Sequence, residues 1–314
     1  MSTMIATRDG FGEELVKLGK TNAKIVVVSA DLEDATRAEY FKKEFPDRFF
    51  SMGIAEQDMV GTAAGLSLMG FIPFINSFAV FLTNRAYDML RMDLCYNNCN
   101  VKIVCSHAGL TVGEDGASAQ CLEDLALMRV LPNMVVICPV DTIEAQKATR
   151  AMAEAKGPMY LRTSRAPLPV LTKESDHFKI GKANVLREGK DVAIFGCGAM
   201  VSEALQAAEI LEKEKINARV VNMHTIKPLD EDMIIRCAKE TGAIVSAEEH
   251  QIYGGLGSAI AEVLVKHQPV PMEMVAVRDT FGESGPPQEL LKAYHLKDAD
   301  IVEAAKKAIK RKRR

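Results

Sequence analysis

The sequence lacks a long hydrophobic run. Its longest apolar stretches, residues 24–30 and 192–196, have the length of a β-strand, whereas a membrane-spanning helix needs about 20 apolar residues. An excess of either charge is also lacking, because 39 Lys and Arg stand against 42 Asp and Glu, for a formal net charge of −3. No overall field therefore attracts nucleic acid or an anionic membrane. The first ten residues lack the basic-then-apolar pattern of a signal peptide, so we expect a cytoplasmic protein.

Cysteine pairs spaced as CxxC are absent as well. The seven cysteines are odd in number and lie mostly in apolar segments, which favours free buried thiols over disulfides or a metal cluster. The single strongly basic stretch is residues 306–314, KKAIKRKRR. A solvated last helical turn explains it better than nucleic-acid binding, because cations suit the C-terminal end of a helix. We therefore expect no nucleic-acid partner and no membrane partner.

Short apolar runs alternate with helix-length amphipathic segments along the whole chain. The composition, 48% hydrophobic and 26% charged, is typical of a globular protein. Strands are expected at residues 24–30, 71–76, 101–106, 134–139 and 159–164, with helical patterns at 10–18, 34–44, 57–69, 79–93, 118–130 and 141–155. This alternation predicts βαβ units, a parallel sheet and an α/β fold.

The alternation of apolar runs and amphipathic segments is interrupted at residues 166–190. This stretch contains two prolines and many charges but no helix-length periodicity, and the alternation continues after it. We therefore predict a first domain over residues 1–167, a linker over 168–190 and a second, smaller domain over 191–314. Each domain is expected to be a doubly wound parallel sheet. In such sheets, functional groups gather in the loops at the carboxyl ends of the strands.

Residues 53–70, GIAEQDMVGTAAGLSLMG, carry the first candidate group. Glu56 lies where the chain enters a helix, and on composition alone it could simply be an acid that favours a helix start. The helix behind it is rich in Gly, Ala and Ser, which leaves little bulk on one side. Another backbone can approach such a face closely, so we expect an interface between domains or chains there.

Two further segments follow predicted strands. Phe78 and Phe81 are three residues apart, so they share one face of a helix, and such a pair taken alone favours core packing over an aromatic binding site. Residues 106–120, SHAGLTVGEDGASAQ, hold three glycines, one histidine and two acids directly after a strand. A loop of this composition at a strand's carboxyl end is a candidate site, although it lacks the pattern of a phosphate-binding P-loop.

Taken together, these segments resemble the C-terminal half of the transketolase family of thiamine diphosphate enzymes. The resemblance rests on GIAEQDM, FIPFINSFAVF, SHAGLTVGEDG, LPNM, YLRTSR, EEHQIYGGLGSA and DTFGESG, which occur in the family's order and cover nearly the whole chain. It implies a pyrimidine-binding thiamine diphosphate domain followed by a transketolase C-terminal domain. The form it resembles most is a split transketolase, in which a separate N-terminal subunit carries the diphosphate-binding domain.

The resemblance also implies where the metal lies. The family's diphosphate-binding domain has GDG followed some 25–30 residues later by Asn, and these residues bind Mg²⁺. Here Asp115 is followed by Asn133, which is at the wrong distance and lies in the LPNM turn. The implied arrangement is thiamine diphosphate shared between two chains, Mg²⁺ held on the partner chain, and no metal site on this chain.

The resemblance assigns the cofactor residues one by one. Glu56 is the acid expected to hydrogen-bond to N1′ of the cofactor's pyrimidine, and Phe81 is expected to stack on that ring with Phe78 beside it. Ile54, in the same GIAEQ segment as Glu56, and Asp31 are placed in the cofactor site as well. For Asp31, capping of the helix expected at residues 34–44 is an open alternative.

The same resemblance implies the substrate contacts. Arg8, His107 and Arg165 are expected at the phosphate or hydroxyls of a sugar phosphate, and Asp115 at a hydroxyl. Arg162 is equally open to a role in the site or in a structural ion pair. The sequence departs from the family at Ala119, where a His usually contacts the donor sugar, and near Ala35, where the family often has a phosphate-binding Ser that Thr36 could replace.

The function implied is transfer of a two-carbon ketol unit between sugar phosphates, in a heterotetramer that also involves self-association through the pyrimidine and C-terminal domains. Three alternatives stay open. They are the β subunit of a 2-oxo-acid dehydrogenase, an enzyme like deoxyxylulose phosphate synthase, and a regulatory or scaffold subunit that kept the fold after losing the histidine. Loss of the ring at Ala119 is compatible with a shifted substrate preference, a histidine from the partner, or reduced activity.

Overall fold

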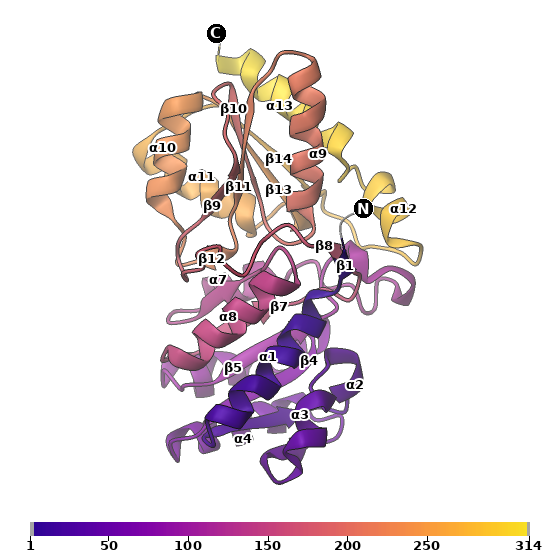
Figure 1. Cartoon of the computed structure of the whole chain (residues 1–314), viewed down its shortest axis with the longest axis vertical. Coiled ribbons are helices and arrows are strands. Elements are labelled where there is room, and N and C mark those ends of the chain that lie inside the picture. The colour runs from indigo at the N-terminus through magenta and orange to yellow at the C-terminus, as the bar shows by residue number, and fades with distance from the viewer. Residues whose placement is uncertain (1–2, 313–314) are drawn as a thin grey trace.

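The computed structural model describes residues 3–312 and shows two α/β halves stacked along the long axis of the molecule (Figure 1). The lower half is built on a seven-stranded sheet in the order β12-β6-β7-β5-β4-β2-β3. Its strands are β2 (Ile25–Ser29), β3 (Phe49–Ser51), β4 (Ile72–Phe78), β5 (Lys102–Ser106), β6 (Val135–Ile137), β7 (Met159–Arg162) and β12 (Thr225–Lys227). All pairs are parallel except β12 with β6.

Helices cover both faces of this sheet because its strands are apolar on both sides. One face packs against α1 (Thr7–Thr21), α3 (Glu39–Glu44) and α8 (Thr142–Glu154); the other packs against α4 (Glu56–Leu68), α5 (Ala79–Arg85) and α7 (Asp124–Val130). Successive residues point to opposite faces, so Val27 joins the core under α1 whereas Val28 joins the core under α4. The doubly wound arrangement expected for this half is confirmed.

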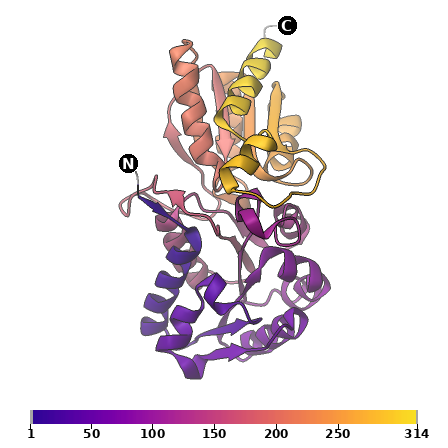
Figure 2. The ribbon, with the colours of Figure 1, turned by 90° about the vertical axis from the view of Figure 1, so that its right-hand side faces the viewer.

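The upper half contains a five-stranded sheet in the order β14-β13-β10-β11-β9, parallel except for the edge strand β9. Its strands are β9 (Asn184–Arg187), β10 (Val192–Gly196), β11 (Ala218–Asn222), β13 (Ile244–Gln251) and β14 (Met272–Val277). One face packs against α9 (Met200–Lys213) and α13 (Asp298–Lys312), and the other against α10 (Glu231–Thr241) and α11 (Leu256–His267). Figure 2 shows the two halves in contact.

Short elements complete the chain. They are β1 (Met4–Ile5), α2 (Glu33–Thr36), the 3₁₀ turn Pro46–Arg48, α6 (Tyr87–Met89), the π-helical turn Leu90–Tyr96, the 3₁₀ segment Leu110–Asp115, β8 (Leu168–Pro169) and α12 (Pro287–Ala293). The helix expected at residues 34–44 is split into α2 and α3 at Arg37, whose backbone adopts φ 67°. Residues 168–190 contain β8, which pairs with β1, and β9 of the upper sheet.

The upper half also completes the lower sheet. Strand β12 follows β11 in the chain but pairs antiparallel with β6, at the edge of the lower sheet. The largest core cluster runs through both halves, with Ile103 of β5 and Phe195 of β10 among its buried members. The two sheets are therefore joined by a shared apolar core and a shared sheet edge.

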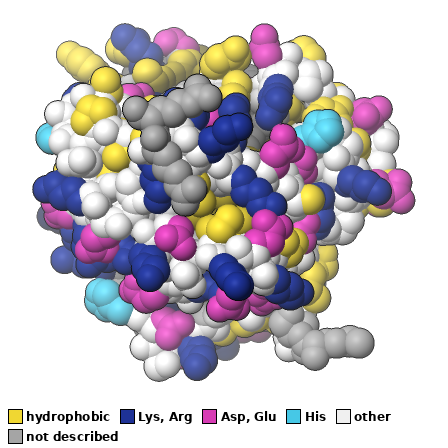
Figure 3. Space-filling view, turned by 90° about the horizontal axis from the view of Figure 1, so that it is seen from above, with side chains coloured by type: hydrophobic (Ala, Val, Ile, Leu, Met, Phe, Trp, Pro, Cys, Tyr) yellow, Lys and Arg dark blue, Asp and Glu magenta, His cyan; other side chains and the backbone are white. Residues whose placement is uncertain are grey.

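All seven cysteines are free and buried, as the sequence predicts. Within residues 3–312, no helix combines the length and the apolar character needed to cross a bilayer. Three cations of the terminal basic stretch pair with acids: Lys306 with Glu214, and Lys307 and Arg311 with Glu273. Figure 3, seen from the C-terminal end, shows positive and negative side chains intermingled there. Residues 313 and 314 of that stretch lie outside the described residues.

A buried carboxyl between the halves gives a prediction about stability. Glu144 of α8 accepts hydrogen bonds from the backbone N–H of Val140 (2.7 Å) and from Asn222 Nδ2 (2.8 Å). Burial raises the pKa of Glu144 from 4.5 to about 7. Since the folded state holds this proton more tightly, the associated stability is present below pH 4.5 and is lost as pH rises through 7. The shift corresponds to about 3 kcal/mol.

We therefore expect Glu144→Gln to gain stability relative to the wild type as pH rises from about 5 to about 8, because the amide has no proton to lose. Urea unfolding at a series of pH values measures the difference. Glu154→Gln, an exposed acid at the end of α8, is the control and should show no such trend. A Glu144→Gln difference that is constant with pH would contradict the prediction.

Candidate functional site

The predicted site residues converge at the carboxyl edge of the lower sheet. Asp31 follows β2, Phe78 ends β4, His107 follows β5 and Arg165 lies three residues beyond β7. Parallel strands bring their carboxyl ends to the same edge, so residues separated by more than 130 positions become neighbours. Arg8, in the first turn of α1, joins this group from the side.

An aromatic stack forms the centre of the site. The ring centroids of Phe78 and Phe81 are 5.5 Å apart with planes 20° from parallel, and the imidazole of His107 lies 3.7 Å from the Phe78 ring. Both phenylalanines are only partly buried. They therefore do not belong to the apolar core. The expectation that they share one face of a helix is wrong, because Phe78 ends β4 and only Phe81 lies in α5.

Glu56 begins α4 next to this stack. Its side chain is 5% exposed, and its Oε1 accepts a hydrogen bond of 2.9 Å from Arg85 Nη1. The Arg85 guanidinium also lies over the Phe81 ring, 4.2 Å from the centroid. A buried carboxyl thus stands beside a flat aromatic surface. Ile54, two residues earlier, is exposed.

His107 is held neutral in this environment. It is buried, its backbone adopts φ 61°, and its Nδ1 lies 2.9 Å from Ser106 Oγ. Burial, followed by the positive charges of Arg8, Arg165 and Arg37, lowers the pKa of His107 to about 3. A neutral imidazole carries one donor nitrogen and one acceptor nitrogen. It therefore suits a hydroxyl group, which can both accept and donate, better than it suits an anionic group.

Two arginines supply positive charge. Arg8 donates to the carbonyl of Ala35 (2.7 Å), but its buried Nε has no acceptor among the described residues. Burial and the nearby charge of Arg37 lower the pKa of Arg8. Arg165 donates to the Val112 carbonyl (3.0 Å) and reaches Asp115 Oδ1 at 3.6 Å. An anion bound here would accept a hydrogen bond from the free Nε of Arg8 and would reduce the repulsion between Arg8 and Arg37. This corner therefore suits a phosphate or a similar anionic group.

The acids Asp115 and Asp31 are exposed at the rim of the site. Asp115 Oδ2 lies 3.9 Å from His107 Nε2, which links it to the aromatic stack. Asp31 lies two residues after the end of β2 and adopts φ 60°. It does not cap the following helix: α2 has Leu32 at its N-cap and no side-chain capping bond.

Burial decides the roles of Thr36 and Arg162, which the sequence left open. Thr36 is buried, and its hydroxyl lies within hydrogen-bonding distance of the Leu32 carbonyl (2.8 Å) and Asn76 Oδ1 (3.0 Å), so it does not face the site. Arg162 is 4% exposed, pairs with Asp124 at 3.3 Å and donates to the Glu249 carbonyl at 3.1 Å. Of its two open roles, the structural ion pair is the one found. Ala119 is buried at the end of the site loop.

The upper half holds the loop that carries His107 and Asp115. The Glu249 carboxylate accepts bonds from the backbone N–H (2.9 Å) and the hydroxyl (3.0 Å) of Thr111. Gln120 Nε2 donates to the Gly113 carbonyl (3.2 Å) and the Glu283 carbonyl (3.0 Å). The site is thus built by both halves.

The sequence interpretation missed Arg85, Arg37, Glu249 and Gln120. For Arg85 a signal existed, because it lies four residues after Phe81 and hence on the same side of α5. For Glu249 none existed, since its partner Thr111 is 138 residues away.

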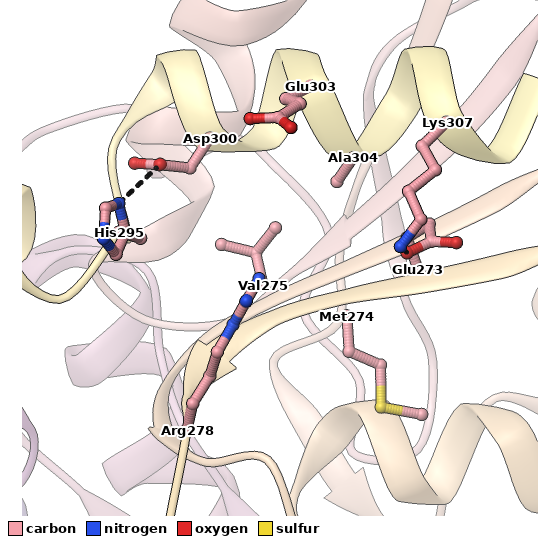
Figure 4. Close-up of a pocket in the computed structure, with 9 residues that line it drawn as sticks. All are labelled: Glu273, Met274, Val275, Arg278, His295, Asp300, Glu303, Ala304 and Lys307. Carbon is pink, nitrogen blue, oxygen red and sulfur yellow. Dashed lines mark ion pairs between the residues drawn. The ribbon is translucent and has the colours of Figure 1, made fainter. Parts of the chain in front are cut away.

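A separate hollow of about 320 Å³ lies in the upper half, between β14 and α13 (Figure 4). His295 pairs with Asp300 at 3.3 Å, and Glu273 pairs with Lys307 at 2.7 Å. Its charges largely neutralise one another, and it shares no residue with the sheet-edge site.

Among residues 3–312, no group of three or more His, Cys, Asp or Glu is arranged to hold a metal ion.

Comparison with known proteins explains this geometry. Residues 3–170 match the family model described as "Transketolase, pyrimidine binding domain", and residues 181–301 match "Transketolase, C-terminal domain". The chain belongs to the transketolase family. The fold and the family expected from the sequence are both confirmed, including the likeness to a split transketolase C-terminal subunit.

Individual relatives support the same assignment. A protein of Methanocaldococcus jannaschii, provisionally named transketolase C-terminal section, is 44% identical over 97% of this chain and 96% of its own length. A 6-deoxy-6-sulfo-D-fructose transketolase subunit of a Clostridium species is 41% identical over 97% of this chain and 95% of its own length. Human transketolase is 40% identical, but the match covers 96% of this chain and 48% of the human one.

Solved structures give the same result. One described as a split gene transketolase, in an inactive β4 tetramer, is 47% identical with a TM-score of 0.91, over 99% of this chain and 100% of the other. Transketolase from Campylobacter jejuni is 24% identical with a TM-score of 0.81, over 96% of this chain and 46% of the other. The second likeness supports the fold alone.

Proposed function

We propose that this chain is the C-terminal subunit of a split transketolase, transferring a two-carbon ketol unit between sugar phosphates together with an N-terminal subunit. The observation that carries the proposal is the meeting of buried Glu56, the Phe78–Phe81 stack, His107 and the Arg8–Arg165 cations at one sheet edge. That edge offers a carboxyl, an aromatic face and an anion-binding corner, the three features that this reaction requires of the chain.

The residues present fit the pyrimidine half of thiamine diphosphate. A buried carboxyl beside a flat aromatic surface suits a ring that carries a basic nitrogen, and residues 3–312 contain no cluster of three or more His, Cys, Asp or Glu arranged to hold a metal ion. When bound, the cofactor would supply a carbanion as the nucleophile for ketol transfer. In this proposal Mg²⁺ and the diphosphate are held by the N-terminal subunit.

The proposed roles follow from position. Glu56 holds a proton at N1′ of the pyrimidine, Phe81 stacks on the ring with Phe78 beside it, and Ile54 and Asp31 border the ring. Arg8 and Arg165 bind the anionic end of the sugar, while neutral His107 and Asp115 bind its hydroxyls. Phosphate and sulfonate present similar oxygens to arginine, and a relative is named for a sulfonated sugar, so the anionic group is proposed as a class.

We also propose self-association through the lower half. Ile54, Leu68 and Met69, around α4, are exposed apolar side chains, and a Cβ added at Gly61 or Gly65 would meet no atom within 4 Å. Large exposed apolar patches mark interaction surfaces, and small residues admit close backbone approach.

The buried free thiols support a reducing compartment, in line with the expected cytoplasmic location.

Co-purification tests the proposal. The chain is isolated with its native partner from cell extract and assayed with xylulose 5-phosphate and ribose 5-phosphate, with and without thiamine diphosphate. Cofactor-dependent ketol transfer by a complex with a second subunit is the expected result. A homo-oligomer without a partner, or a complex that decarboxylates 2-oxo acids, would instead favour one of the alternative family members.

Arg8 provides a test of the anion site. We expect Arg8→Met to raise KM for phosphorylated sugars by about 10- to 100-fold, because a charge-assisted hydrogen bond contributes about 1.5–3 kcal/mol. Arg91→Met is the matched control, since Arg91 is exposed and belongs to none of the groups at the sheet edge. For an unphosphorylated sugar, Arg8→Met should change KM little. Equal losses for both sugars would show that Arg8 does not bind the phosphate.

A further inference from the structure

Arg85 makes two contacts at once, and both involve residues assigned to the cofactor's pyrimidine. Its Nη1 donates to Glu56 Oε1 at 2.9 Å, and its guanidinium lies 4.2 Å from the centroid of Phe81. A guanidinium is flat, delocalised and carries its donors along its edge, so it can stack on an aromatic ring while bonding to a carboxylate. A protonated aminopyrimidine has the same flat shape and the same edge donors.

We propose that Arg85 occupies the place of the pyrimidine ring in the cofactor-free subunit, and that it must swing away when thiamine diphosphate binds. This inference rests on the proposed function. It assigns to Arg85 a role as a displaceable internal competitor, which neither the family assignment nor the roles of Glu56 and Phe81 imply.

The surroundings of Arg85 allow this movement. Its side chain is 49% exposed, it is the last residue of α5, and its guanidinium has no further hydrogen bond among the described residues. Gln57 Nε2 holds the backbone carbonyl of Arg85 at 2.9 Å, so the backbone stays fixed while the side chain turns. Half of the Arg85 side chain is already exposed, so water can solvate its charge once it turns away, while the bound ring takes over the hydrogen bond to Glu56.

The contacts of Arg85 with Glu56 and Phe81 also stabilise the subunit while no cofactor is bound. Glu56 is 5% exposed, and a buried carboxylate without a partner destabilises a fold. Phe81 is only partly covered by the protein, with Phe78 and Arg85 as its stacking neighbours. In the cofactor-free subunit, Arg85 therefore pairs with Glu56 and covers the Phe81 ring. Because the cofactor must displace Arg85, these contacts lower the affinity for the cofactor.

Calorimetric titration of thiamine diphosphate with Mg²⁺ into the reconstituted two-subunit complex tests this inference. We expect Arg85→Ala to bind the cofactor about tenfold more tightly, because one weak ion pair and one cation–π contact no longer compete. Without cofactor, the same variant should melt at a lower temperature than the wild type, since Glu56 loses its partner. Arg91→Ala, at an exposed arginine shortly after α5, is the matched control and should change neither value.

Two results would overturn the inference. Equal cofactor affinity of wild type and Arg85→Ala would show that Arg85 does not compete, and weaker binding by the variant would show that Arg85 holds the bound cofactor instead. Either result leaves the proposed function intact. A wild-type complex that binds no thiamine diphosphate would overturn the proposed function together with this inference.

Discussion

Replacement of Glu56 by Gln is expected to lower ketol transfer by the reconstituted complex about 10³-fold, within the range for loss of a general acid or base. Glutamine fills the same space but cannot hold and release a proton at N1′. Assembly should persist, because Glu56 lies inside the chain's own fold at the start of α4. Steady-state rates and size-exclusion chromatography of the same samples measure both effects.

Asp58→Asn, an exposed acid half a turn further along α4, is the matched control and should keep full activity. The result also separates an enzyme from a scaffold subunit that merely retains the fold. If Glu56→Gln retains activity close to that of the wild type in a complex that depends on thiamine diphosphate, the role proposed for Glu56 is wrong.

The second large effect concerns stability. Asp124 is fully buried and accepts hydrogen bonds from Tyr160 Oη at 2.7 Å while pairing with Arg162 Nε at 3.3 Å. We expect Asp124→Ala to destabilise the protein by about 3–5 kcal/mol, because it leaves the Arg162 charge buried and unpaired. Urea unfolding, followed by circular dichroism, gives the change.

Two further variants identify the cause. Tyr160→Phe removes one neutral donor and is expected to cost only about 1 kcal/mol. Combining Asp124→Leu with Arg162→Met removes both charges, and should recover most of the stability lost in Asp124→Ala. If the double variant is no more stable than Asp124→Ala, the loss comes from packing and not from the unpaired arginine.

Much of the fold could be predicted from the sequence. The apolar runs correctly marked β2, β4, β5, β6 and β7, because buried parallel strands are continuously apolar. Strands β3 and β12 were not predicted, since neither lies in an apolar run as long as the one that contains β6. The break at Arg37 was also not predicted, because a positive φ there is imposed by packing and hydrogen bonds and not by a glycine.

For the candidate site, the loops could be predicted but their neighbours could not. The sequence singled out His107 because a strand ends beside it, but its stacking on Phe78 depends on how β4 and β5 align. Arg162 stood in a segment that resembles the family's substrate site, yet its position at the end of a central strand buries it against Asp124. Such contacts depend on the tertiary fold, which local patterns do not describe.

The pairing of strand β12 with β6 affects how the protein responds to proteolysis and to unfolding. It shields β6, a strand whose backbone would otherwise be open to pairing with another chain. Proteolytic nicking between residues 170 and 225 followed by loss of the C-terminal piece would uncover that edge, along with the apolar residues of the shared core. A fragment of the lower half alone would therefore aggregate, and intact chains should unfold in a single cooperative transition in which both sheets are lost together.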